Sequence, residues 1–297
     1  MVHMKIRDTR GEKIFYAVNY FLLVLLSFIC VYPMYYVLIG SLSEPVRMLS
    51  HRGMLILPLG LSVDSFSKVF QYPMIPIGYR NTLFYVIAGT VFNLFLTILG
   101  AYGLSRKKLM FRNAIMFMIV FTMFFQGGLI PTYLWMKQMS LLNTFWAMLL
   151  PRAISAWNLI IMRTSFAAIP DSLLESAKID GAGDVMILSR IIIPLSTAVI
   201  AVMVLYYGVS NWNRWFDALI YLRDRKLYPL QLVLREILIA NDTSQMTTSA
   251  VSASDKEPLG VTIKYATIII ATLPILTVYP FIQKYFIKGV MIGAIKG

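Results

Sequence analysis

Five long stretches of the chain contain no Asp, Glu, Lys or Arg, and they restrict the possible folds more than any other feature. They cover residues 14–43, 81–105, 113–136, 191–213 and 265–283. Because an α-helix rises about 1.5 Å per residue, roughly 20 apolar residues cross the hydrocarbon core of a bilayer. A sixth stretch, 141–162, is interrupted by charge only at Arg152, next to Pro151. The sequence therefore predicts an all-α membrane protein with six transmembrane helices.

The composition agrees with this class. Hydrophobic residues make up 58% of the chain and charged residues 14%, whereas soluble proteins carry about 45–50% apolar and about 25% charged residues. The single cysteine, Cys30, excludes a disulfide within the chain. The two histidines, His3 and His51, are too far apart to form a metal cluster, so we expect no metal site.

The distribution of basic residues orients the predicted helices, because short loops rich in Lys and Arg stay in the cytoplasm. Such residues precede the first stretch, fill the short connection between 81–105 and 113–136, and follow the last stretch. They are Lys5, Arg7, Arg10, Lys13, Arg106, Lys107, Lys108, Arg112, Lys284, Lys288 and Lys296. We therefore expect cytoplasmic tails at 1–13 and 286–297, and a membrane domain at 14–285. Within that domain, 164–190 is a cytoplasmic loop and 214–264 a long external loop. The net charge of +13 then requires no nucleic-acid partner.

The cytoplasmic loop contains several residues with plausible local roles. Ser172 and Glu175 have the spacing of a helix capping box. Gly181 suits the end of a helix, and Pro194 suits the first turn of the next one. These roles explain each residue separately, but they do not explain the joint spacing of Glu175, Gly181 and Pro194.

That spacing resembles the coupling loop of permease subunits in bacterial ATP-driven (ABC) importers with the type I fold. The resemblance covers nearly the whole chain, because residues 127–131, 211–216 and 288–297 are similar to the smaller, MalG-like permease of sugar importers. Within that branch the sequence looks closest to permeases for oligosaccharides, including the alginate importer. The resemblance implies a bacterial inner-membrane subunit that moves a carbohydrate, including acidic, uronate-containing ones, into the cytoplasm.

The same resemblance implies the partners. They are a second permease, two ATP-binding-cassette subunits that hold ATP and Mg, an extracytoplasmic solute-binding protein, the saccharide and membrane lipid. This chain would then be no enzyme and hold no cofactor. The ATPase would contact Glu175, Ser176, Ala177, Asp180, Gly181, Ala182, Ile191 and Pro194, and also the tail residues Ile292, Gly293, Ala294 and Lys296. The binding protein would contact Trp215, Arg223, Asp224, Arg225 and Tyr228.

Polar residues inside predicted membrane helices mark a candidate substrate path, because they usually face a cavity or another helix. The candidates are Gln126, Arg152, Trp157, Asn158, Asn211 and Asn213, with Asn93 as a further polar position. Arg152 reads as an uncompensated cation whose nearest polar neighbour on a continuous helix would be Ser155. It either lines a wet cavity, where its guanidinium suits a carboxylated sugar, or lies at the outer interface.

Two other functions remain open at this point. One is a permease for a solute other than sugar. The other is an ion-coupled secondary transporter, which usually carries an Asp or Glu in mid-membrane. None of the six stretches contains such a residue. An enzyme is disfavoured because the chain has no phosphate-binding loop of the Gly-x-x-x-x-Gly-Lys type.

Overall fold

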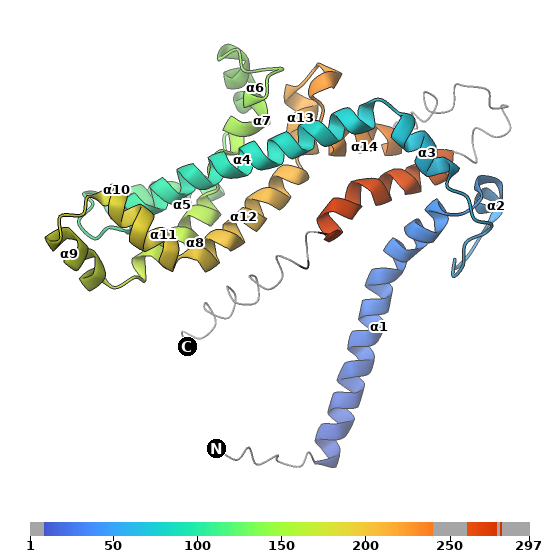
Figure 1. Cartoon of the computed structure of the whole chain (residues 1–297), viewed down its shortest axis with the longest axis horizontal. Coiled ribbons are helices and arrows are strands. Elements are labelled where there is room, and N and C mark those ends of the chain that lie inside the picture. Colours follow the sequence, from blue (N-terminus) through green and yellow to red (C-terminus); the bar gives the residue numbers. More distant parts are fainter. Residues whose placement is uncertain (1–8, 240–259, 278–279, 281–297) are drawn as a thin grey trace. The chain divides into compact units, whose positions relative to one another are not determined.

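The computed structural model describes residues 9–239, 260–277 and 280 (Figure 1). These residues form helices, and the one β-type pairing among them is an isolated bridge between Ser43 and Leu61. The described residues divide into two compact units, 9–71 with 260–270 and 72–239 with 271–277 and 280. The predicted tail contacts Ile292, Gly293, Ala294 and Lys296 lie outside the described residues, as does the end of the stretch 265–283.

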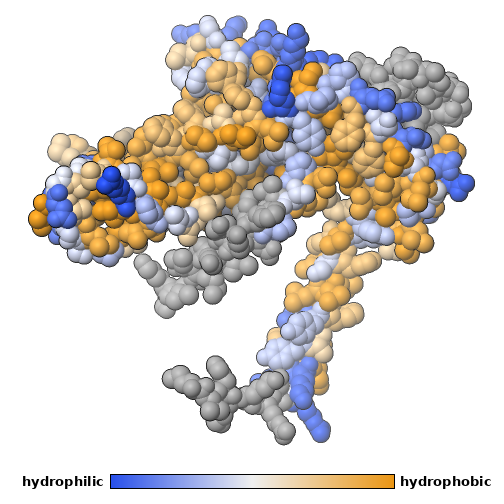
Figure 2. Space-filling view, in the orientation of Figure 1, coloured by the Kyte–Doolittle hydropathy of each residue, from blue (hydrophilic) through white to orange (hydrophobic). Residues whose placement is uncertain are grey.

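The first unit contains α1 (Arg10–Ser41), α2 (Pro45–Ser50), α3 (Asp64–Gln71) and the first part of a helix at Gly260–Thr277. A capping box starts α1: the Thr9 N–H donates to the Glu12 carboxylate at 2.6 Å, and the Glu12 N–H donates to Thr9 Oγ1 at 3.3 Å. Most side chains of α1 are apolar and exposed (Figure 2), so lipid or another protein must cover them.

The helix Gly260–Thr277 packs within this unit through close contacts. Ser65 Oγ donates to Thr262 Oγ1 at 2.7 Å. A Cβ on Gly40 would lie 2.9 Å from the Tyr265 ring, so glycine permits the approach of α1 to this helix.

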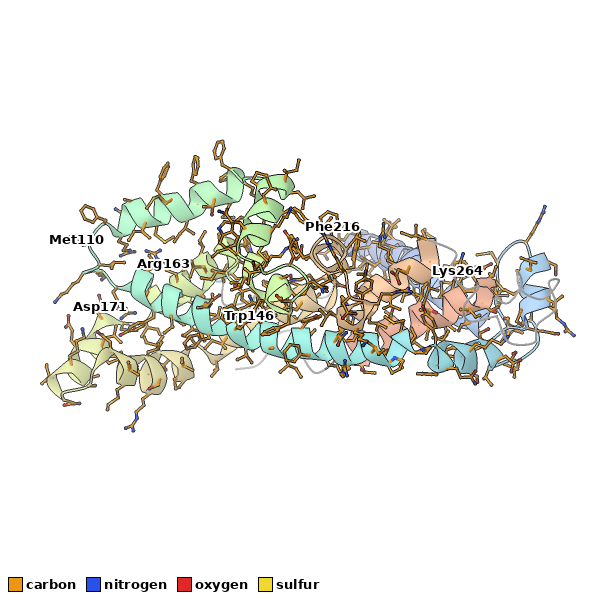
Figure 3. The ribbon with its side chains drawn as sticks, turned by 90° about the horizontal axis from the view of Figure 1, so that it is seen from above. Met110, Trp146, Arg163, Asp171, Phe216 and Lys264 are labelled. Carbon is orange, nitrogen blue, oxygen red and sulfur yellow. The ribbon has the colours of Figure 1, made fainter. Side chains whose placement is uncertain are left out.

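The second unit is organised around α4 (Met74–Ser105). Packed against it are α8 (Ala156–Ala167), α12 (Thr197–Trp212) and α14 (Leu230–Ile239) (Figures 1 and 3). The buried apolar cluster between these helices includes Leu104, Phe166, Ile192 and Met203.

Two predicted crossings are bent. The stretch 113–136 forms α5 (Arg112–Phe124) and α6 (Leu129–Gln138), and the chain bends by 111° between these two helices. Gly128 lies at this bend with φ +86°, a conformation that favours glycine. The helical run Asp184–Leu195 meets α12 at 84°. Each of these two predicted crossings is therefore bent rather than one continuous helix.

Pro194 lies in the first turn of α11 (Ile193–Leu195), as its spacing predicted, but α11 continues the preceding helical run and does not begin a new membrane helix. The proline lies near the end of a helical run made of α10 (Asp184–Ile187), a π-helical turn (Leu188–Ile192) and α11. A proline inside a helix lacks an N–H and crowds the carbonyl four residues before it. The wider π-turn immediately before Pro194 accommodates this proline.

The stretch 141–162 is not one helix either. It contains α7 (Trp146–Leu149), a 3₁₀ turn (Leu150–Arg152) and the start of α8, for which Ser155 is the N-cap. The prediction that Ser155 shares a helix face with Arg152 is therefore wrong. By length and composition, the described residues contain three helices that could cross a membrane, or five if each bent pair forms one crossing.

Candidate functional site

The predicted coupling loop contains α9 (Asp171–Ile179), which ends as the sequence indicates. Gly181 has φ +82°. The Gly181 N–H donates to the Lys178 carbonyl at 3.1 Å, and the Ala182 N–H donates to the Ala177 carbonyl at 2.9 Å. This bond pair is a Schellman motif. The predicted role of Gly181 at the helix end is therefore confirmed.

The predicted capping box at the start of α9 is wrong. The helix begins at Asp171 after the N-cap Pro170, so Ser172 already lies in the first turn and caps nothing. Its carbonyl instead accepts a hydrogen bond from Ser176 Oγ at 2.9 Å. The chain leaves Glu175 exposed and, among the described residues, without an ion pair.

One side of α9 is anchored to the helical core and the other presents apolar groups. Leu174 is buried in the cluster that contains Phe166. Ile179 is 86% exposed and Val185, just after the loop, is 81% exposed. Exposed apolar side chains gathered on a polar loop indicate a protein interface.

Ion pairs and a hydrogen bond fix both ends of the loop. Lys107 Nζ lies 2.5 Å from Asp171 Oδ2, and this hydrogen bond lowers the pKa of Asp171 below its ordinary value. Tyr102 donates to Asp184 Oδ1 at 2.9 Å, and Lys178 Nζ lies 3.7 Å from the same oxygen. Two of the loop's four acidic residues are therefore paired within this chain, whereas Glu175 and Asp180 form no ion pair with the described residues. Asp171 is labelled in Figure 3.

Asn93 stabilises the break in the stretch 141–162. Its Nδ2 donates to the carbonyls of Arg152 at 2.9 Å and Ala153 at 2.7 Å, and its Oδ1 accepts from Asn211 Nδ2 at 3.2 Å. The Tyr207 hydroxyl accepts from the Ser155 N–H at 3.2 Å. A broken helix in a bilayer needs such internal partners, because lipid offers none. Asn93 and Asn211 therefore have a structural role.

Asn93→Leu is expected to destabilise the protein by about 2–4 kcal/mol, because it leaves two carbonyls and the Asn211 amide without these bonds. The thermal unfolding midpoint of the detergent-solubilised chain measures this effect. Thr122→Val is the control, since Thr122 is exposed and bonds within its own helix. Equal midpoints for Asn93→Leu and the control would contradict the structural role.

Arg152 belongs to a charged cluster that the sequence did not predict. Its Nε lies 3.0 Å from Asp217 Oδ2 and its Nη2 donates to Asp217 Oδ1 at 3.2 Å. Arg214 Nε lies 3.5 Å from Asp217 Oδ2, and Arg214 also donates to the Met148 carbonyl. Arg152 is therefore paired, and its description as an uncompensated cation was wrong.

Asp217 is the residue that sequence reasoning missed. It lies in α13 (Trp215–Tyr221), just past the uncharged stretch 191–213. Its side chain is 9% exposed, that of Arg214 6% and that of Arg152 57%. The signal that could have found it is the spacing of Arg214 and Asp217, which puts them on one helix face next to a membrane stretch.

The other path candidates are not brought together. Gln126 lies in the bend between α5 and α6, and Trp157 is exposed on the first turn of α8. Asn158 is buried, and exposed Asn213 bonds to the Val209 carbonyl of its own helix at 3.0 Å. Within the described part of the chain, Asn93 joins the backbone of Arg152 to Asn211, and the other four candidates stand apart.

The first part of the predicted external loop is ordered by two asparagines. Asn143 Oδ1 accepts from the N–H groups of Arg223 at 2.9 Å and Asp224 at 2.8 Å. Asn81 Nδ2 donates to the Tyr228 carbonyl at 3.0 Å. Further contacts join Arg225 to Glu236 at 2.7 Å and place Arg235 over the Trp215 ring at 5.1 Å. The five candidate contacts of a binding protein therefore lie on one supported segment.

Residues 83–292 match the family model described as "Binding-protein-dependent transport system inner membrane component". This match covers more than half of the chain. The chain belongs to this family. The permease is thus a membrane component of a transport system rather than an enzyme, and the family description assigns it to the inner membrane.

Two relatives of the permease come from Bacillus subtilis strain 168. The polygalacturonan/rhamnogalacturonan transport system permease protein YtcP is 41% identical over 96% of this chain and 99% of its own. Protein LplC is 39% identical over 98% of this chain and 97% of its own. The permease also superposes with a TM-score of 0.86 and 32% identity on a chain of a bacterial ABC transporter involved in the import of the acidic polysaccharide alginate. That match covers 95% of this chain and all of the other. The all-α ABC importer permease fold is confirmed.

Proposed function

We propose that this permease is one of two membrane subunits of an ABC importer for uronate-containing oligosaccharides. The observation that carries the proposal is the agreement of two similarities. One relative is named for polygalacturonan transport, and the structural neighbour takes part in alginate import. Both polymers are built from uronic acids, so their fragments carry carboxylates. A permease for a non-sugar solute and an ion-coupled transporter are not favoured by these similarities.

The coupling loop supports the assignment of the ATPase contact. A separate ATP-binding-cassette subunit, with its own ATP and Mg, docks on the exposed surface of α9 around Glu175, Ser176, Asp180 and Gly181. Ile191 has a different part in this proposal, because it packs against the permease's own buried cluster. It and Pro194 shape the helical run that follows the loop.

The remaining partners follow from the surfaces described above. The exposed apolar side chains of α1 face lipid or the second permease. The supported segment with Trp215, Arg223 and Tyr228 faces an extracytoplasmic solute-binding protein, and both chain ends lie in the cytoplasm. No nucleic acid takes part.

Uptake by the complete transporter tests this function. The permease, its second permease, its ATPase and its binding protein are reconstituted in proteoliposomes. We expect ATP-driven accumulation of labelled trigalacturonate, and ATP hydrolysis that rises when the loaded binding protein is present. If the transporter accumulates only a neutral trisaccharide, the assignment of an acidic substrate is wrong, but the assignment as a sugar permease stands. Failure with both sugars would overturn the carbohydrate assignment.

A further inference from the structure

The charged cluster of Arg152, Arg214 and Asp217 carries one more positive than negative charge. Arg214 and Asp217 are both buried and together are neutral. Arg152 is the surplus cation, and its side chain is more than half exposed. A charge in the membrane-spanning part of a protein is costly unless it is paired or hydrated, and it commonly marks the path of a substrate.

We propose that Arg152 binds a carboxylate of the substrate and that Asp217 is its exchangeable partner in the empty transporter. This inference rests on the proposed function and assigns its carboxylate subsite. Asp217 contacts the edge of the guanidinium formed by Nε and Nη2. A substrate carboxylate forms the same pair of charge-assisted hydrogen bonds, so one carboxylate replaces another with little change in the bonds made.

Arg214 makes this exchange possible. When Arg152 turns from Asp217 to the substrate, Asp217 keeps the buried guanidinium of Arg214 as its partner. The exchange therefore leaves no buried carboxylate unpaired, which would be strongly destabilising. With a bound carboxylate the site holds two positive and two negative charges.

The backbone around Arg152 is held in place while its side chain exchanges partners. Asn93 donates to the carbonyls of Arg152 and Ala153 at 2.9 and 2.7 Å. The 3₁₀ turn is thus tied to α4 through Asn93. Asp217 and Asn93 are positioning residues in this scheme, and Arg152 is the group that touches the substrate.

The experiment compares trigalacturonate with its methyl ester, which has the same sugar backbone but carries a neutral methyl ester in place of each carboxylate. The complete transporter in proteoliposomes is assayed with unchanged permease, Arg152→Gln and Arg152→Lys. For Arg152→Gln we expect the ratio of kcat/KM for the acid to that for the ester to fall at least about tenfold. Arg152→Lys, which keeps the charge but loses the planar fork, gives an intermediate ratio. Because the binding protein is the same in every assay, its own preference cancels between variants.

Arg47→Gln is the matched control. Arg47 is also an exposed arginine paired with a carboxylate of this chain, since its Nε lies 2.7 Å from Glu44 Oε2. We expect its substrate ratio to equal that of the unchanged permease. Arg152→Gln keeps the buried Arg214–Asp217 pair, so the variant is expected to fold, and its amount in the membrane is measured alongside uptake.

The outcomes separate this inference from the proposed function. If the unchanged permease imports the acid and Arg152→Gln keeps the same ratio, Arg152 does not bind the carboxylate and the proposed function stands. An equal loss for acid and ester also overturns the inference, because it shows a structural role for Arg152. If the unchanged permease imports neither substrate, the proposed function itself fails.

Discussion

The Asp217→Ala permease is expected to be less stable than the unchanged protein by about 3–5 kcal/mol. The substitution removes a buried carboxylate and leaves the Arg214 guanidinium, whose side chain is 6% exposed, without its counter-charge. The measurement is the thermal unfolding midpoint in detergent, followed by the loss of a monodisperse peak in size-exclusion chromatography. Arg152→Ala is the matched comparison, because it removes the exposed partner and keeps the buried pair. We expect its loss to be about 0.2–1 kcal/mol.

A double substitution tests whether the unpaired charge of Arg214 causes the destabilisation expected for Asp217→Ala. Arg214→Met together with Asp217→Leu removes both buried charges and keeps apolar volume, and such replacements are often neutral or stabilising. We expect the double variant to unfold at a higher temperature than Asp217→Ala. If Asp217→Ala unfolds at the temperature of the unchanged protein, the pair contributes nothing to stability.

Gly181→Asp and Glu175→Lys are both expected to abolish ATP-driven uptake while the permease still inserts into the membrane. At Gly181 any other residue must adopt φ near +82°, which costs roughly 1–2 kcal/mol. A Cβ there would also project into open space on the proposed docking surface of the ATPase. At Glu175 the substitution reverses the charge of an exposed carboxylate in the proposed ATPase contact, and we expect docking to weaken by about 2–5 kcal/mol. Co-purification of the ATPase and uptake are measured together.

Ser172→Ala is the control on the same helix. Ser172 is exposed, and its side chain does not cap α9, so both ATPase binding and uptake are expected to match the unchanged transporter. Normal uptake by Gly181→Asp and Glu175→Lys, with a full complement of ATPase, would show that α9 is not the docking surface.

The positions of the straight membrane helices could be predicted from sequence, but their bends could not. The stretch 14–43 corresponds to α1 at Arg10–Ser41, because a helix covered by apolar groups on all sides reads as a long uncharged run. Hydropathy records what a segment is made of and not its direction. The bends at Gly128 and Ser196 therefore left the apolar content of their stretches unchanged.

The candidate site divides in the same way between local and distant interactions. Gly181 was predictable because a Schellman motif is made by residues within one turn. The capping box was wrong because the N-cap of α9 is Pro170, two residues before the expected Ser172. The pairing of Asp217 with Arg152 was missed because the two residues lie 65 positions apart in sequence. No spacing rule connects two residues that distant.

The distance between Arg152 and Asp217 along the chain also has a consequence for how the protein is made. At a synthesis rate of about 5–20 residues per second, Arg152 leaves the ribosome roughly 3–13 seconds before Asp217. The two residues are 65 positions apart. Asn93 is translated earlier than both, so it is already present when the carbonyls of Arg152 and Ala153 are made. The Arg152 guanidinium can pair with Asp217 only after Asp217 is translated. Asn93 is therefore available to the carbonyls at the break before α13 is made, whereas Arg152 gains its counter-ion only with Asp217.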